Sequence, residues 1–152
     1  MKAILKFIIL LLPWFLPSLT PIDKTYYNSL NLPWFTPPQI AYGIIWTIIY
    51  IMITISVYKV ITTKKKKDIP SSYKYTLLLN YLCNQSFQPT FFLLKNNFLA
   101  FVSCLLTWLS SLFLYKETKE LNSDASKYLI FYILFSLFAT ILSLTIYFLN
   151  LN

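Results

Sequence analysis

Five long apolar runs constrain this chain of 152 residues more than any other feature of its sequence. The runs cover, approximately, residues 6–19, 38–60, 73–94, 98–115 and 128–149. Each of the last four is long enough to cross the roughly 30 Å hydrocarbon core of a bilayer as a helix, which satisfies its backbone hydrogen bonds internally. The sequence therefore predicts an all-α membrane protein, a bundle of five transmembrane helices forming one domain over residues 1–152.

The first run is interrupted by Pro13 and Pro17. Lys2 and Lys6, followed by an apolar stretch, resemble the start of a signal peptide, but no small-residue cleavage site follows. We therefore expect a retained helix that is kinked at the prolines. Membrane helices tolerate such kinks because neighbouring groups satisfy the freed carbonyls.

The composition excludes several classes of function. Only 12% of the residues are charged, about half the share of a soluble domain, and histidine is absent. Without histidine there is no imidazole base and no histidine metal ligand, and the five acidic residues all lie outside the apolar runs. Cys83 and Cys104 lie in apolar runs without CxxC spacing, so we expect buried structural thiols and no metal site.

The lysines predict the orientation in the membrane. If the N-terminus and the second and fourth connections share one side, only Lys24 and Lys95 of the 13 basic residues lie on the other side. The positive-inside rule then places the N-terminus in the cytoplasm and the C-terminus outside. Anionic lipid headgroups explain the net charge of +8 without a nucleic-acid partner.

The connection between the first two runs, residues 20–37, lies on the side with few lysines. Its sequence "PIDKTYYNSLNLPWFTPPQ" is rich in proline and aromatic residues. This composition is typical of a folded segment, and we expect an external cap over the mouth of the bundle.

Amide side chains form a stripe on the third run. Asn80, Asn84 and Gln88 recur every four residues and so share one face of a helix. Amides are costly against lipid, so this face should turn inward, either to line a cavity or to hydrogen-bond a neighbouring helix. Pro89 directly follows the stripe and predicts a kink or an unwound turn.

A second stripe, on the second run, is aromatic. Tyr42, Trp46 and Tyr50 are also spaced by four residues, and Gly43, the single glycine, would allow close approach of a helix or a ligand. By itself such a face is typical of a core or of an interfacial belt. Beside an amide face it suits a planar ligand, whose ring stacks on aromatic groups while amides orient its polar edge.

The segment "YYNSLNLPWFTPPQIAYGIIWTIIY" resembles the TspO/MBR family, the tryptophan-rich sensory proteins and translocator proteins also called peripheral-type benzodiazepine receptors. The segments "LNYLCNQSFQPTFF", "NNFLAFVSCLLTW" and "LFATILSLTIYFLN" are similar to its third, fourth and fifth helices, in that order. The resemblance is strongest to the bacterial branch. It implies a homodimeric five-helix bundle in a bacterial cell membrane, with a pocket for porphyrin-type tetrapyrroles below the first loop.

The resemblance also implies which residues form that pocket. The family's pocket positions correspond to Tyr27, Pro37, Trp46, Tyr50, Asn84, Phe87, Phe135 and Ala139. At Phe135 the family often has a tryptophan, and a phenyl ring keeps the stacking but lacks the readily oxidised indole. We therefore predict a ligand-binding sensor or regulator with no required cofactor. Its partners would be membrane lipid and a protoporphyrin IX-like ligand without iron. The alternatives are a light- and oxygen-dependent porphyrin-degrading enzyme that uses Trp46, and a small-molecule transporter.

Overall fold

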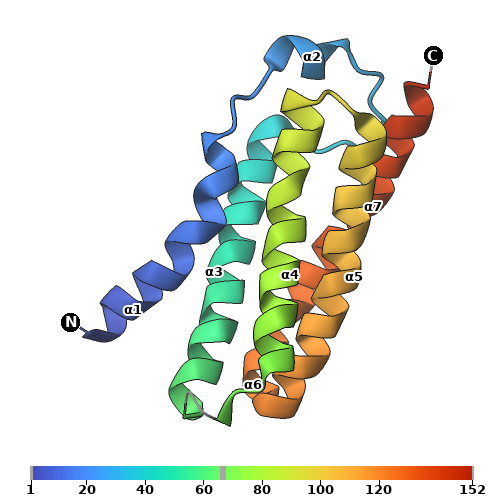
Figure 1. The fold of residues 1–152 in the computed structure, drawn as a ribbon. Coiled ribbons are helices and arrows are strands. Elements are labelled where there is room, and N and C mark those ends of the chain that lie inside the picture. Colours follow the sequence, from blue (N-terminus) through green and yellow to red (C-terminus); the bar gives the residue numbers. More distant parts are fainter. Residues whose placement is uncertain (1, 66–67, 152) are drawn as a thin grey trace.

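The computed structural model describes residues 2–65 and 68–151, and all the regular structure within them is helical (Figure 1). The elements are α1 (Lys2–Leu11), η1 (Leu12–Leu19), α2 (Lys24–Ser29), α3 (Gln39–Thr63), α4 (Ser71–Gln88), η3 (Pro89–Leu93), α5 (Asn97–Leu121), α6 (Ser123–Ser126), η4 (Lys127–Leu129) and α7 (Ile130–Leu149).

Three helical stretches are long and apolar enough to cross a membrane, namely Gln39–Thr63, Asn97–Leu121 and Ser123–Leu149. A shorter apolar stretch covers Ala3–Leu19, and α4 runs alongside the long helices (Figure 1). The amide stripe makes α4 the least apolar of the long helices. These features show an integral membrane protein built as a helical bundle.

The N-terminal helix changes form at its prolines. The α-helix ends at Leu11, and the chain continues as a tighter 3-10 helix that contains Pro13 and Pro17. The carbonyl of Pro13 in this segment accepts a hydrogen bond from the Tyr81 hydroxyl of α4 at 3.1 Å. A neighbouring helix thus holds the proline-containing segment, and α1 leans away from α3 toward the N-terminus (Figure 1).

The expected change at Pro89 is confirmed. α4 ends at Gln88, and residues Pro89–Leu93 form a widened π-helical turn. The Thr90 hydroxyl satisfies the carbonyls of Ser86 and Phe87, both at 2.9 Å, within this turn. At the other end of the hairpin, α5 continues past the expected end at Tyr115 to Leu121.

The connection between η1 and α3 is a folded cap across one end of the bundle, as its composition predicts. Asp23 accepts the Tyr26 N–H at the start of α2 and forms an ion pair with Lys95 at 2.7 Å. Further along, the Asn31 N–H donates to Asn150 Oδ1 at 2.9 Å, and Asn150 Nδ2 donates to the Asn31 carbonyl at 3.0 Å. The cap is thereby joined both to the α4–α5 connection and to the end of α7.

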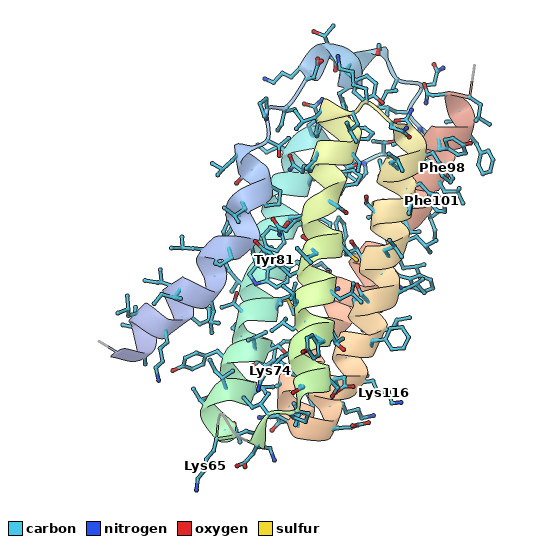
Figure 2. All side chains as sticks on the ribbon, viewed as in Figure 1. Lys65, Lys74, Tyr81, Phe98, Phe101 and Lys116 are labelled. Carbon is cyan, nitrogen blue, oxygen red and sulfur yellow. The ribbon has the colours of Figure 1, made fainter. Side chains whose placement is uncertain are left out.

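Lysines gather at the opposite end of the bundle. Figure 2 shows Lys65, Lys74 and Lys116 at the end away from α2. Lys66 and Lys67, which the orientation argument also uses, lie outside the described residues. The cap and the lysine-rich end are therefore on opposite sides of the bundle.

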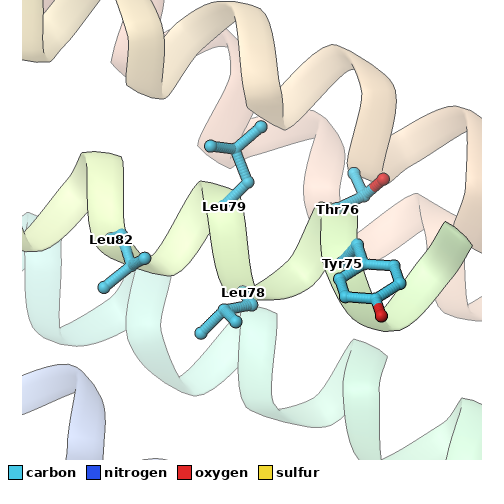
Figure 3. Close-up of a pocket in the computed structure, with 5 residues that line it drawn as sticks. All are labelled: Tyr75, Thr76, Leu78, Leu79 and Leu82. Carbon is cyan, nitrogen blue, oxygen red and sulfur yellow. The ribbon is translucent and has the colours of Figure 1, made fainter. Parts of the chain in front are cut away.

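The outer face of α4 carries a shallow groove of about 370 Å³ (Figure 3). It is lined by Tyr75, Thr76, Leu78, Leu79 and Leu82. The three leucines are more than half exposed, so this face points out of the bundle toward lipid or a second molecule.

Candidate ligand-binding site

Asn80 ties three helices together in the middle of the bundle. This fully buried side chain on α4 donates from Nδ2 to Ser110 Oγ at 2.9 Å and to the Thr107 carbonyl at 3.3 Å, both on α5. Its Oδ1 accepts the hydroxyl of Tyr132 on α7 at 3.1 Å. Both amide hydrogens are thus used within the protein. Of the two roles that the amide stripe allowed, Asn80 has the helix-joining one.

Asn84, one turn further along α4, joins the same network. Its Oδ1 accepts the hydroxyl of Tyr50 on α3 at 3.1 Å, and its Nδ2 donates to the Tyr132 hydroxyl at 3.4 Å. A carboxamide has two hydrogens and two acceptor sites, so Asn84 retains one of each. We call Asn80, Asn84, Tyr50 and Tyr132 the amide–tyrosine layer.

Gln88 and Gln85 differ from both asparagines. The Oε1 atom of Gln88 and both amide atoms of Gln85 are buried and have no hydrogen-bond partner among the described residues. Buried polar atoms without partners are uncommon in proteins and favour a site that binds water or a ligand.

An aromatic layer borders the amide–tyrosine layer on the side of the cap. The Trp46 ring centroid lies 5.6 Å from that of Tyr50, 6.4 Å from Tyr132 and 5.5 Å from Phe135. The ring of Phe135 in turn lies 5.7 Å from that of Phe138. The Trp46 side chain is partly exposed.

The cap contributes Phe35 to this aromatic layer. The Phe35 ring lies 6.3 Å from Phe138, the residue before Ala139 on α7. We define the aromatic layer as Trp46, Phe135, Phe138 and Phe35. Pro37 stands two residues beyond Phe35, at the point where the cap enters α3. Both Pro37 and Ala139 are partly exposed.

Tyr27 and Phe87 meet at a third residue. The rings of Tyr27 and Phe87 lie 6.5 Å and 5.4 Å from that of Phe91, and the Phe87–Phe91 pair is stacked with an interplanar angle of 14°. Phe91 is buried in the π-helical turn after Pro89. The structure thus brings Trp46, Tyr50, Asn84 and Phe135 into one connected group and places Tyr27 and Phe87 in a second group under the cap.

The sequence analysis missed three residues that organise these groups: Tyr132, Phe91 and Trp14. Tyr132 stands three residues before Phe135 and so on the same face of a helix, a signal that could have found it. Trp14 is buried and stacks on Tyr50 with ring centroids 5.7 Å apart. No pattern in the sequence indicates that pairing, because it depends on how the first helix docks on α3.

Two expectations need correction. A Cβ built on Gly43 meets no atom within 4 Å, so this glycine does not serve a close approach of helices. Cys104 is buried as expected, but Cys83 is only partly buried, and both are free thiols. The described residues contain no group of three or more His, Cys, Asp or Glu side chains that could hold a metal ion.

An ion pair and polar contacts fasten the cap to the α4–α5 connection. The Lys95 ammonium group hydrogen-bonds the carboxylate of Asp23 and holds its pKa below the ordinary value, and the Tyr26 N–H lowers it further. Tyr26 also donates its hydroxyl to Asn97 Oδ1 at 2.8 Å. The cap therefore has charged and polar contacts in addition to its ring contacts, whereas Trp46 and Phe135 beneath it meet their neighbours through ring contacts.

Comparison with known proteins identifies the relatives of this chain. The sequence model of the TspO/MBR family matches residues 6–149. The tryptophan-rich protein TspO of Bacillus cereus is 40% identical over 132 residues, which is 87% of this chain and 85% of the relative. The uncharacterized membrane protein YtaB of Bacillus subtilis is 40% identical over 136 residues, which is 88% of this chain and 85% of that protein. A tryptophan-rich protein TspO of Chlorobaculum tepidum is 26% identical over 125 residues, which is 82% of this chain and 79% of that protein.

Proposed function

The chain belongs to the TspO/MBR family of membrane proteins, and from this premise we propose that it is a sensor or regulator that binds porphyrin-type tetrapyrroles and similar planar hydrophobic ligands. The observation that carries the proposal is the contact between two unlike layers inside the bundle. The Trp46 ring lies directly against the amide–tyrosine layer. A flat ring with a polar edge needs both surfaces together.

In this proposal the ligand enters beneath the cap and displaces part of the aromatic layer. Ring contacts are less directional than hydrogen bonds, so Phe135 can repack around a ligand at modest cost. Trp46 stacks on the ligand or donates its N–H, and Asn84 offers its remaining hydrogen and acceptor site to the polar edge. The other lining residues of the proposal are Tyr27, Pro37, Tyr50, Phe87 and Ala139.

The proposal also includes an arrangement in the bacterial cell membrane. The α1–η1 stretch and α4 would add two crossings to the three long apolar helices, giving five. The lysine-rich end would face the cytoplasm, with the N-terminus there and the C-terminus outside. A second copy of the chain would pack on the exposed leucines of α4 (Figure 3), and crosslinking in membranes tests this homodimer.

A titration of the detergent-purified protein with protoporphyrin IX, followed by tryptophan fluorescence, tests the site. We expect Trp46→Ala to weaken binding by about tenfold, which corresponds to 1.4 kcal/mol, and Asn84→Ala to weaken it less. Trp34→Phe is the matched control, because Trp34 is 95% exposed on the cap. Unchanged affinity in Trp46→Ala would show that the ligand binds elsewhere.

One observation favours an oxidative enzyme as the second candidate. Trp14, Tyr50 and Trp46 form a continuous chain of ring contacts, with successive ring centroids 5.7 Å and 5.6 Å apart. A second tryptophan, Trp14, therefore lies close to Trp46. It comes from the first helical stretch, whereas the position at which the family often has a tryptophan is Phe135 in this chain. Illumination of the porphyrin complex in oxygen should then give a new product spectrum that Trp46→Phe abolishes. Ligand uptake into proteoliposomes without a product would indicate transport instead.

A further inference from the structure

A wedge opens between α1 and α3 at the lysine-rich end of the bundle, far from the cap. Because α1 leans away from α3 toward the N-terminus (Figure 1), the two helices leave a hollow of about 260 Å³ between them. Its lining residues are Lys6, Ile9, Leu10, Ile61 and Thr62. We propose that this hollow binds an anionic phospholipid, with the headgroup at Lys6 and part of an acyl chain against the apolar wall.

The walls of the hollow suit a hydrocarbon chain. Leu10 and Ile61 are partly buried and pack against the main hydrophobic core, while Ile9 is 58% exposed. Next to the hollow, the Phe7 and Tyr58 rings meet edge to face with centroids 6.0 Å apart, which keeps α1 and α3 in contact there. The hollow is smaller than the 300–1,000 Å³ typical of drug-sized ligand pockets, so a tetrapyrrole does not fit it, whereas a segment of a narrow acyl chain does.

The charge at the hollow is positive and uncompensated. Lys6 forms no ion pair with any described residue. The single lysine of α3, Lys59, has its ammonium 5.6 Å from the centre of the Tyr128 ring. Asp124 on α6 already pairs with Lys127 at 2.7 Å. An anionic headgroup is therefore the complementary partner for Lys6.

The order of groups along α1 matches a lipid standing in one leaflet. Lys6 lies nearer the end of the bundle, and Ile9 and Leu10 lie about one helical turn deeper. Thr62 adds little polarity to the wall, because its hydroxyl already donates to the Tyr58 carbonyl at 2.7 Å. A bound chain would fill the wedge and hold α1 at its present angle to α3.

Native mass spectrometry of the full chain, with phosphatidylglycerol or phosphatidylcholine of identical acyl chains, tests this site. We expect the wild type to retain severalfold more phosphatidylglycerol, and Lys6→Gln to lose most of that preference. Lys116→Gln is the matched control, since Lys116 is an exposed lysine at the same end but away from the wedge (Figure 2). Ile9→Trp, which fills the hollow, should reduce retention of both lipids.

Two results would overturn the proposal. One is equal loss of phosphatidylglycerol in Lys6→Gln and Lys116→Gln, which would indicate general attraction to lysines. The other is equal retention of the two lipids by the wild type. Lys6→Arg, which keeps the charge, should bind like the wild type and thereby exclude misfolding as the cause of a loss. Soluble glycerol phosphate should not compete, because it has no acyl chain.

Discussion

The amide–tyrosine layer and the aromatic layer lie side by side in the bundle, yet they are held together by different forces. In the first, Asn80 and Asn84 connect α3, α4, α5 and α7 through directional hydrogen bonds. In the second, Trp46, Phe135, Phe138 and Phe35 meet only through their rings. A hydrogen bond lost in a membrane interior leaves an unsatisfied polar group, whereas ring contacts can re-form in a new arrangement.

This difference teaches which layer maintains the fold and which can admit a ligand. The amide–tyrosine layer fixes the positions of four helices and has little freedom to change. The aromatic layer lies between it and the cap and can exchange one set of ring contacts for another. Four predictions test this division of roles and the attachments around the two layers, in order of decreasing expected effect.

The largest effect should come from Asn80→Ala. The variant removes three interhelical hydrogen bonds of roughly 0.6–1.7 kcal/mol each and should lower the free energy of unfolding by about 2–4 kcal/mol. Unfolding in mixed micelles of increasing SDS content measures this. Leu79→Ala is the control, because the adjacent Leu79 is 56% exposed on the outer face of α4. Equal losses in the two variants would contradict a special role for the layer.

A direct comparison of the layers uses Tyr132→Phe and Phe135→Leu. Tyr132→Phe deletes a hydroxyl that donates to Asn80 and accepts from Asn84, and should cost about 1–2 kcal/mol of stability. Phe135→Leu should cost less than about 1.5 kcal/mol but weaken porphyrin binding more than Tyr132→Phe does. Unfolding titrations measure the stability of both variants, and porphyrin titrations measure their affinity. The reverse ranking in both measurements would remove the distinction between the layers.

Tyr81→Phe tests how the first helix is attached beside the two layers. It removes the hydrogen bond to the Pro13 carbonyl and should cost about 0.6 kcal/mol, the average for such bonds in a membrane protein. The Trp14 and Tyr81 rings are in contact, with centroids 5.2 Å apart, so the fluorescence of Trp14 should also change. Tyr75→Phe, at an exposed position on the same helix, should leave both stability and fluorescence unchanged.

The smallest effect should come from the cap above the aromatic layer. Lys95 lowers the pKa of Asp23, so the stabilisation of the cap by this carboxylate is present above its ordinary pKa near 3.8. It is lost as the pH falls through the lower pKa of the folded state. Limited proteolysis of residues 20–38 should therefore accelerate at strongly acidic pH. Asp23→Asn should show the faster cleavage already at neutral pH and little further change on acidification.

Several features of the fold follow from local sequence. The prolines at positions 13, 17 and 89 predict where helical geometry changes, because a missing N–H has the same consequence in any surroundings. The apolar runs predict an all-α membrane protein because a bilayer leaves the backbone few other ways to satisfy its hydrogen bonds. The spacing of Asn80 and Asn84 also predicts that both face inward, and both are buried.

The sequence by itself determined the class of protein and the inward faces of its helices, because periodicity and missing donors act within a few residues. Only the tertiary structure decided the partners of those faces. Asn80 could have lined a cavity, and its hydrogen bonds to Ser110 and Tyr132 depend on the packing of α5 and α7 against α4. Likewise, Trp14 and the hollow at Lys6 owe their surroundings to the angle at which α1 docks on α3, which the contacts of all the helices set together.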